Sequence, residues 1–278
     1  MGVLSVRGLV LSFTLQKEMN RSVRILTKSH GILYCYAPGA AKPGNRFMGG
    51  TQPGVFSEFS LTQSKAGWYV KEVEIIEPFR GMLSSFDGLT AAAHLMEIAA
   101  DAGVDAKTAG EILSIVLLAF YAMNRHPDEC RRIVSAAEWR LTDVLGYPAN
   151  FMSVEEWGTA EKTFATFSFS TCQLYLSNKG RAEGATSRNL SMGTVRALDY
   201  VRRAPLREMF SFEVAPDVLE EMAYLTHRYL CERLDKAYNK MDLLRSTELL
   251  AGVLDGGLAG SGDLVVRGDD DGVPVLGE

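Results

Sequence analysis

The sequence lacks any long hydrophobic run. Its longest apolar stretch, Ile112–Met123, has 12 residues and includes Ser114, whereas a helix that spans a bilayer needs about 20. Near the start, Leu9–Leu15 is short, carries two hydroxyl residues and is followed by no small-residue cleavage motif. Such a segment is not typical of a secretory signal. The sequence therefore predicts a cytoplasmic protein with no membrane partner.

Cysteine is scarce. The 278 residues include four cysteines, Cys35, Cys130, Cys172 and Cys231. They lie far apart and form no Cys-x-x-Cys pair, the spacing typical of thiolate metal sites and redox motifs. We expect reduced, mostly buried thiols. Cys172 has no basic residue adjoining it that would lower its pKa, so its sequence context favours a structural role.

Motifs of catalysis are also missing. The four histidines lie in separate segments, and no Gly-x-Ser-x-Gly elbow, Walker A loop or dinucleotide-binding glycine motif is present. The acidic triplet Asp269–Asp271 is more typical of a solvated charge run than of a cation site, which needs converging oxygens on a scaffold. The sequence therefore predicts no enzyme activity, no cofactor and no bound metal.

What the sequence does have is an uneven distribution of charge. The formal net charge is −5, but residues 1–80 carry ten Lys or Arg against five Asp or Glu. Residues 246–278 carry one Arg against seven acidic residues and include eight glycines and no aromatic residue. This composition predicts a flexible acidic tail. A basic N-terminal region, in contrast, is compatible with a nucleic-acid partner.

The first 80 residues have the pattern of short strands. Apolar and β-branched runs separated by glycine, proline and asparagine occur at Ser5–Leu15, Ser22–Thr27, Gly31–Ala37, Val55–Leu61 and Trp68–Ile76. Five strands in this length predict a small closed barrel. An OB-fold, which binds oligonucleotides, and an SH3-like barrel both fit this pattern.

The hydrophobic period then changes to that of helices. Helices are predicted over Ser84–Ala102 and Lys107–Met123, from Pro127 to Gly146, from Ser191 to Pro205, and from Pro216 to Met241. We therefore predict an α+β protein with an N-terminal barrel at 1–80 and a mainly helical domain in two parts, 81–150 and 191–245. Residues 151–190 fit neither period and are expected to form an irregular insert, followed at 246–278 by the tail.

Five basic residues of the barrel are candidates for contact with DNA phosphates. They are Arg21, Arg24, Lys28, Lys42 and Arg46, of which the last two flank a turn-rich loop. Cations on one face of a barrel can follow a phosphate backbone, and nearby aromatics (Tyr34, Tyr36 and Phe47) could stack on bases. The alternative is that the cations are solubilising surface charges and the aromatics are core residues.

The order and spacing of several segments resemble a known family. They are Arg21–Thr27 with His30–Gly31, Pro38–Phe47, Gln52–Pro53, Glu74–Phe79, Glu138–Leu141 and Leu145–Tyr147. Over residues 1 to about 245 this chain is similar to the RecO family of bacterial recombination mediators. The resemblance implies an N-terminal five-stranded OB-fold β-barrel followed by a helical domain.

The resemblance also implies a function without catalysis in the RecF pathway of DNA repair and homologous recombination. Such proteins bind single- and double-stranded DNA, anneal complementary strands and help to load RecA onto DNA coated with single-stranded DNA-binding protein (SSB). The implied partners are RecR and the acidic SSB C-terminal tail. By this resemblance the five basic residues become DNA contacts, and Arg132 and Arg140 become candidates for binding the carboxylates of the SSB tail.

The chain departs from the family pattern in the insert. Where the family commonly has a Cys-x-x-Cys-Gly motif, this sequence has Val154–Gly158, and Cys172 is the one cysteine in 151–190. Four thiolates cannot be assembled there, so we predict a small irregular insert that lacks zinc ligands. We expect apolar side chains to hold it instead: Phe164, Phe167, Phe169, Leu174, Tyr175 and Leu176.

Two other functional classes are compatible with parts of this pattern. A non-catalytic adaptor would use the helical domain to bind proteins, with the barrel serving a structural purpose. An enzyme acting on nucleic acid is disfavoured by the missing carboxylate and His/Cys motifs. Retention of DNA without a protein partner would separate the first class from a DNA-binding mediator.

Overall fold

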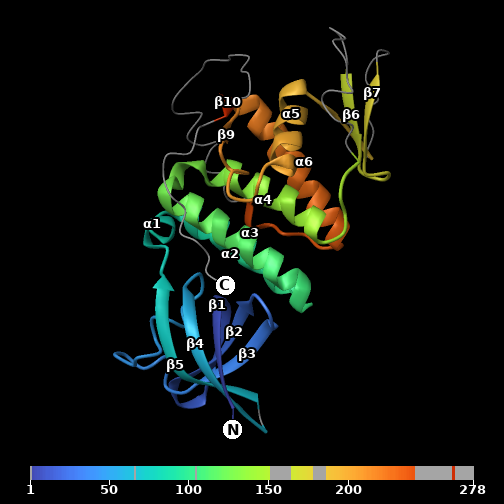
Figure 1. Ribbon diagram of the computed structural model, residues 1–278. Coiled ribbons are helices and arrows are strands. Elements are labelled where there is room, and N and C mark those ends of the chain that lie inside the picture. Colours follow the sequence, from blue (N-terminus) through green and yellow to red (C-terminus); the bar gives the residue numbers. More distant parts are fainter. Residues whose placement is uncertain are drawn as a thin grey trace. The chain divides into compact units, whose positions relative to one another are not determined.

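The computed structural model describes residues 2–65, 67–103, 105–150, 164–177, 186–241 and 265–266 (Figure 1). The chain divides into two compact units, Met1–Asp128 and Glu129–Glu278. The first helices belong to the same compact unit as the barrel because they pack against its strands. Each unit is described by itself below.

The first unit begins with a closed five-stranded barrel. Its strands are β1 (Val3–Gln16), β2 (Asn20–Thr27), β3 (Gly31–Ala37), β4 (Phe56–Ser64) and β5 (Gly67–Glu77). They close in the order β1-β2-β3-β5-β4, with antiparallel neighbours except for the parallel β3–β5 pair. This arrangement confirms the predicted OB-fold.

Alternating residues of the strands fill the barrel. On β2, Val23 and Ile25 are fully buried, and they pack with residues of every other strand, including Phe59 of β4. The loop at 38–55 adds Phe47, which is 5% exposed, to the same core. The suggestion that Phe47 stacks on bases is therefore wrong, since its ring is inside the barrel. Gly8 is required by packing, because a Cβ there would lie 2.4 Å from Cγ2 of Ile25.

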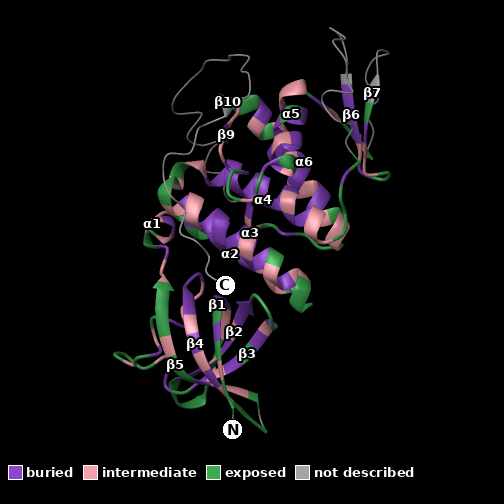
Figure 2. Cartoon of the chain, in the orientation of Figure 1, coloured by how far each residue is buried: buried purple, intermediate pink, exposed green. Residues whose placement is uncertain are grey.

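Three helices complete the first unit: α1 (Arg80–Leu83), α2 (Phe86–Ala102) and α3 (Ala106–Arg125). Ser85 and Asp105 begin the two longer helices by accepting hydrogen bonds from the backbone N–H groups of Gly88 and Thr108. Contrary to our expectation from the sequence, α3 is long and apolar enough to cross a bilayer. However, 56% of its most apolar segment is buried inside the protein. Figure 2 shows this burial, which is typical of a core helix.

The second unit is built on three helices: α4 (Cys130–Val144), α5 (Met192–Arg203) and α6 (Pro216–Leu234). Trp139 of α4 is 1% exposed and donates its indole N–H to the carbonyl of Leu198 on α5 at 3.1 Å. Its ring lies 5.7 Å from that of Tyr229 on α6. The last helix ends earlier than predicted, because Asp235 adopts a left-handed conformation with φ 49°.

The predicted irregular insert contains a regular sheet. Strands β6 (Phe164–Ser168), β7 (Gln173–Ser177) and β8 (Ser187–Leu190) pair antiparallel in the order β7-β6-β8. The expectation of irregular structure is wrong for these residues, since short polar-rich strands carry a weak sequence pattern.

Packing of the insert agrees with the prediction for some of the apolar residues. Phe167, Phe169 and Leu174 are buried, with Phe167 5.4 Å from the Tyr229 ring. Tyr175 is 45% exposed, so the prediction is wrong for that residue. The burial of Phe164 and Leu176 lies outside what the structure describes.

A long-range contact alters the environment of Cys172. The thiol accepts a hydrogen bond from Nη1 of Arg233 on α6 at 3.2 Å. As inferred, no basic residue adjoins Cys172 in the sequence. In the folded protein, however, Arg233 is a basic neighbour of its thiol, so the inference is wrong for the three-dimensional structure.

A short piece of the acidic tail is paired. Val265–Val266 form β10, which lies antiparallel to β9 (Phe212–Glu213). At these two residues the structure differs from the predicted flexible tail. The other tail residues lie outside the described part of the chain.

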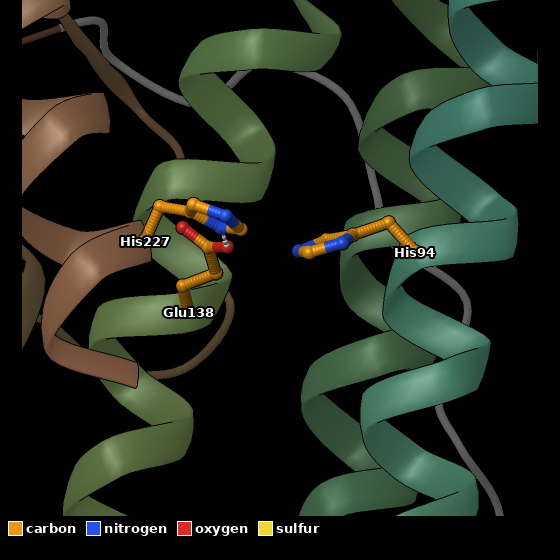
Figure 3. A group of neighbouring side chains, drawn as sticks. All are labelled: His94, Glu138 and His227. Atoms are coloured by element: carbon orange, nitrogen blue, oxygen red, sulfur yellow. Dashed lines mark hydrogen bonds and ion pairs between the residues drawn. The ribbon is translucent and has the colours of Figure 1, made fainter. Parts of the chain in front are cut away.

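A buried ionic network joins α4 to α6 in the second unit. Glu138 is 1% exposed, and its Oε1 lies 2.8 Å from Nδ1 of His227 (Figure 3, which also draws His94 of the first unit). Its Oε2 accepts a hydrogen bond from the hydroxyl of Thr226 at 3.0 Å. Burial alone lowers the pKa of His227, but hydrogen bonds with Cys231 and Glu138 and the carboxylate charge raise it to about 10.

This network predicts a loss of stability at high pH. The folded-state pKa of His227 lies above its ordinary value of 6.5, so its stabilisation is complete below that value and is lost as the pH rises through about 10. We expect the free energy of unfolding in urea to fall as the pH is raised over this range. His227→Gln should remove that part of the pH dependence. Parallel pH profiles for the two proteins would contradict the assignment.

Candidate nucleic-acid interface

Arg21 and Arg24 lie on opposite faces of β2, because successive side chains of a strand alternate and these two are three residues apart. Arg21 is 6% exposed and faces the barrel. Its Nη1 donates to the carbonyl of Met48 at 3.0 Å and to the hydroxyl of Thr51 at 2.9 Å, and its guanidinium lies 4.1 Å from the Phe13 ring centre. Arg21 holds the 38–55 loop, so we leave it out of the candidate interface.

Arg24 lies on the outer face of β2 and is half-buried. Its Nη2 donates to the carbonyl of Ala100 near the C-terminal end of α2 at 2.9 Å. The guanidinium also lies 5.6 Å from the ring centre of Tyr34. It therefore connects the strand to α2 and at the same time borders an exposed tyrosine.

Lys28 is separated from the other predicted cations. It is exposed in the turn between β2 and β3, where its carbonyl lies close to Gly110 of α3. The loop that carries Lys42 and Arg46 follows the other end of this hairpin, where Arg21 pairs with Ala37. Six residue steps at about 3.3 Å each separate the two ends by about 20 Å.

Four exposed cations gather where the 38–55 loop begins and where β5 passes it. We call Lys17, Lys42, Arg46 and Lys71 the basic rim. Nη2 of Arg46 donates to the carbonyl of Lys71 at 2.9 Å. Lys71 itself lies at an irregularity in the β4–β5 register, in which Ser60 pairs with Glu72 and Leu61 with Val70. Such a bulge changes the direction in which a side chain points from the strand.

Asn20 joins the turn that carries Lys17 to the loop that carries Lys42. Its Oδ1 accepts from the backbone N–H of Gly39, and its Nδ2 donates to the carbonyl of Lys17, both at 2.6 Å. The backbone N–H of Ala41 donates to the carbonyl of Met19 at 2.9 Å. These bonds position two segments of the basic rim side by side.

A row of tyrosines lies next to the basic rim on the outer face of β3 and β5. We call Tyr34, Tyr36 and Tyr69 the tyrosine strip. Tyr34 is 60% exposed, and the rings of Tyr36 and Tyr69 lie 5.2 Å apart on paired positions of the two strands. Exposed rings beside cations can stack on bases while the cations contact phosphates.

The outer surface over β1, β4 and the later part of β5 is acidic. Glu58 of β4 pairs directly with Glu74 of β5, and Ser60 pairs with Glu72. Arg7 is occupied by Glu58, with Nε 3.3 Å from Oε2. These carboxylates would repel a phosphate backbone, so the basic rim and the tyrosine strip remain the candidate nucleic-acid interface.

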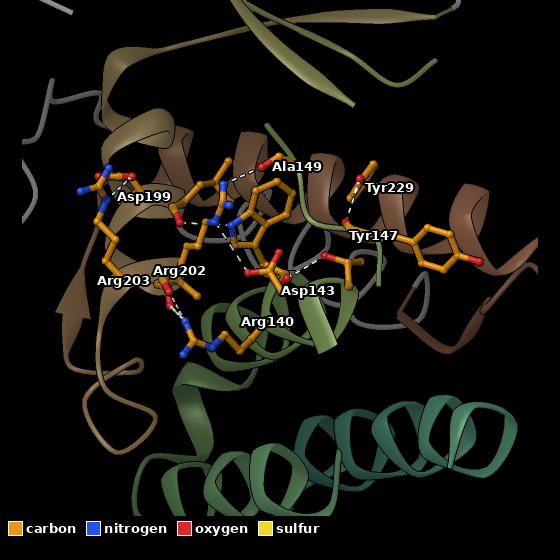
Figure 4. A network of polar contacts seen from close by, with 12 residues as sticks. Arg140, Asp143, Tyr147, Ala149, Asp199, Arg202, Arg203 and Tyr229 are labelled. Carbon is orange, nitrogen blue, oxygen red and sulfur yellow. Dashed lines mark hydrogen bonds and ion pairs between the residues drawn. The ribbon is translucent and has the colours of Figure 1, made fainter. Parts of the chain in front are cut away.

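Arg132 and Arg140 are occupied within the second unit. Arg132 is 9% exposed and bonds to the carbonyl of Phe210 and to the carboxylate of Glu129. Arg140 donates to the carbonyls of Val201, at 3.1 Å, and of Arg202, in the last turn of α5 (Figure 4). Both side chains stabilise the fold, which argues against a free anion-binding role.

Groups that could hold a metal do not converge inside either unit. Of the described residues, no three His, Cys, Asp or Glu side chains from a single unit bring their ligand atoms together. The insert supplies one thiol, Cys172, which does not fit a four-thiolate zinc site.

Several interface residues were missed by sequence reasoning. Lys17, Lys71 and Tyr69 lie outside the 38–55 loop, which carries Lys42 and Arg46. Strand pairing and the hydrogen bonds of Asn20 bring them next to this loop. The available signal was the alternation of β5, which places Tyr69 on the opposite face from the buried Val70.

The barrel defines the class of protein. An OB-fold binds oligonucleotides through the face of its second and third strands and the adjoining loops, and here β3 carries two residues of the tyrosine strip, Tyr34 and Tyr36. A family model for the N-terminal domain of recombination protein O matches residues 1–79, and one for its C-terminal domain matches residues 83–242. The chain belongs to the RecO family, whose role is in DNA repair and recombination.

Curated relatives cover almost the same length. The DNA repair protein RecO of Acetivibrio thermocellus is 30% identical over 248 residues, which are 89% of this chain and 98% of the relative. The RecO proteins of Clostridium novyi and Clostridium acetobutylicum are 20% and 21% identical over 243 and 244 residues. These alignments cover 87% and 88% of this chain, and 94% and 98% of the relatives.

Proposed function

We propose that this chain binds single- and double-stranded DNA without catalysing a reaction and anneals complementary strands. The observation that carries this proposal is the tyrosine strip beside the basic rim on one face of the OB barrel. Membership of the RecO family supports it.

The two parts of this face would act differently. The basic rim neutralises phosphates and releases counterions, which provides affinity for any sequence. The tyrosines stack on the bases of a single strand, which keeps them unpaired and exposed to a second strand. Reduced repulsion between two bound backbones then favours annealing.

The proposed cellular role is to help load RecA onto DNA coated with SSB, in the cytoplasm. RecR and the SSB C-terminal tail are the proposed protein partners, as the family resemblance implies. The internal bonds of Arg132 and Arg140 make these side chains poor candidates for binding the SSB tail. Any such docking would therefore use other residues.

Lys42→Ala combined with Arg46→Ala tests the DNA-binding face. Each lost phosphate contact lowers the salt dependence of single-strand binding by about 0.7 in log–log slope. We expect the slope to fall by about 1.4 and affinity at low salt to fall about tenfold, regardless of DNA sequence. Fluorescence anisotropy with labelled oligonucleotides measures both quantities.

A matched control removes two exposed cations of the same unit from another place. Lys28 lies in the β2–β3 turn and Lys107 in α3, and the Lys28→Ala, Lys107→Ala protein should bind nearly as the parent does. Equal losses in the two double variants would mean a diffuse charge effect. An unchanged affinity in the rim variant would contradict the proposed face, and absence of DNA binding by the parent chain would favour the adaptor class.

A further inference from the structure

We propose that Cys231 is a reactive thiol that hydroperoxides oxidise, with His227 as its proton donor and Glu138 as the residue that positions His227. Cys231 and His227 are four residues apart on α6 and therefore lie on the same side of this helix. Glu138 reaches them from α4. The proposal does not depend on DNA binding.

The three side chains form a continuous chain of contacts. Sγ of Cys231 lies 3.7 Å from Nε2 of His227, and Nδ1 of the same ring lies 2.8 Å from Glu138. The carboxylate is fixed in turn by the hydroxyl of Thr226. A thiol, an imidazole and an orienting acid in this order are the arrangement that activates nucleophilic cysteines.

Protonation of the imidazole is what makes the thiol reactive. Burial lowers the pKa of His227, but its hydrogen bonds with Cys231 and Glu138 and the carboxylate charge raise it above the ordinary value, so Nε2 carries a hydrogen that it can donate to sulfur. The imidazolium lies beside the sulfur and can protonate the oxygen that leaves when the thiolate, the nucleophilic form of cysteine, reacts.

The other thiols have different surroundings. Cys35 is 1% exposed inside the barrel, and burial raises the pKa of its thiol to about 12. Cys130 is 2% exposed. Cys172 is half-buried and contacts Arg233 rather than an imidazole. Cys231 is half-buried and has a proton donor beside its sulfur.

The reaction is a two-electron oxidation of sulfur. The thiolate attacks one oxygen of the hydroperoxide, an S–O bond forms and the O–O bond breaks. Sulfur becomes a sulfenic acid, and the leaving oxygen takes the proton of Nε2 to depart as water or an alcohol. His227 is then neutral and regains its proton from solvent.

The test uses the full chain at neutral pH with hydrogen peroxide, followed by dimedone and mass spectrometry of each cysteine peptide. We expect a dimedone adduct on Cys231 that forms faster in the folded protein than in urea, because only the folded chain places His227 beside the sulfur. A half-buried thiol without activation would react more slowly when folded. His227→Gln should slow the reaction about tenfold while the far-UV circular dichroism is unchanged.

Glu138→Gln provides a second variant if the first does not fold. It keeps the shape of the side chain, removes the charge that holds the imidazolium, and should slow oxidation in the same direction. Alkylation of Cys231 by iodoacetamide needs no proton donor. His227→Gln should therefore slow this alkylation less than it slows oxidation by hydrogen peroxide. Oxidation of Cys231 that is slower in the folded chain than in urea, or unchanged in both folded variants, would overturn the proposal.

Discussion

Glu138→Ala is expected to lower the free energy of unfolding by about 3–5 kcal/mol, the cost of removing one partner from a buried ion pair. The substitution removes the carboxylate that keeps the buried His227 protonated, and the side chain of that histidine is only 14% exposed. It also leaves the buried hydroxyl of Thr226 without the oxygen to which it donates. Chemical denaturation followed by circular dichroism measures the loss.

Glu232→Ala is the matched control for this prediction. It removes a carboxylate of the same unit, but one that pairs with Arg228 on the surface of α6 at 37% side-chain exposure. Exposed pairs four residues apart on a helix contribute about 0.3–0.5 kcal/mol. If the two variants lose similar amounts of stability, the ionic network joining α4 to α6 is not the stabilising feature that its geometry indicates.

Tyr36→Ala combined with Tyr69→Ala is expected to weaken binding of single-stranded DNA about 30-fold or more. Stacking of a base on an aromatic ring contributes about 1–3 kcal/mol, and two rings lying 5.2 Å apart are removed together. Bases of a duplex are already stacked on one another, so affinity for double-stranded DNA should fall by less than about threefold. Titration of each DNA form at one salt concentration measures this difference.

The phenylalanine variants are the control for the tyrosine strip. Tyr36→Phe with Tyr69→Phe keeps both rings and removes the hydroxyl groups, so single-strand affinity should stay close to that of the parent. The rim variant should weaken binding of both single- and double-stranded DNA. The alanine variant of the tyrosine strip should mainly weaken binding of single-stranded DNA. Equal losses for single and double strands in the tyrosine variant would assign these rings to the fold rather than to the bases.

Sequence reasoning located the main elements well. Runs of alternating apolar residues marked the five barrel strands, and Ser191, where a helix was predicted to begin, is the capping residue of α5. These signals are local, because a strand or cap depends on neighbours within a few positions. The insert was harder, since β6, β7 and β8 are each four or five residues long and are defined by pairing across the chain.

The candidate interface was predicted in part for the same reason. Lys42 and Arg46 lie in one loop and are close in the sequence, so they were found together. Arg21 was included on charge alone, and its position on the inner face of β2 became evident from its bonds to Met48 and Thr51. Whether a cation faces solvent depends on the register of the whole barrel, which no local pattern specifies.

The sequence by itself determined the fold class, the family and the concentration of positive charge in the first 80 residues, because periodicity, motif order and composition are written along the chain. The tertiary structure decided which cations share a surface. Closure of the barrel brought Lys17 and Lys71 to the loop of Lys42 and Arg46, and packing of α6 placed His227 between Glu138 and Cys231. Such contacts join residues distant in the sequence, and their chemistry depends on distance and burial, which only the folded chain has.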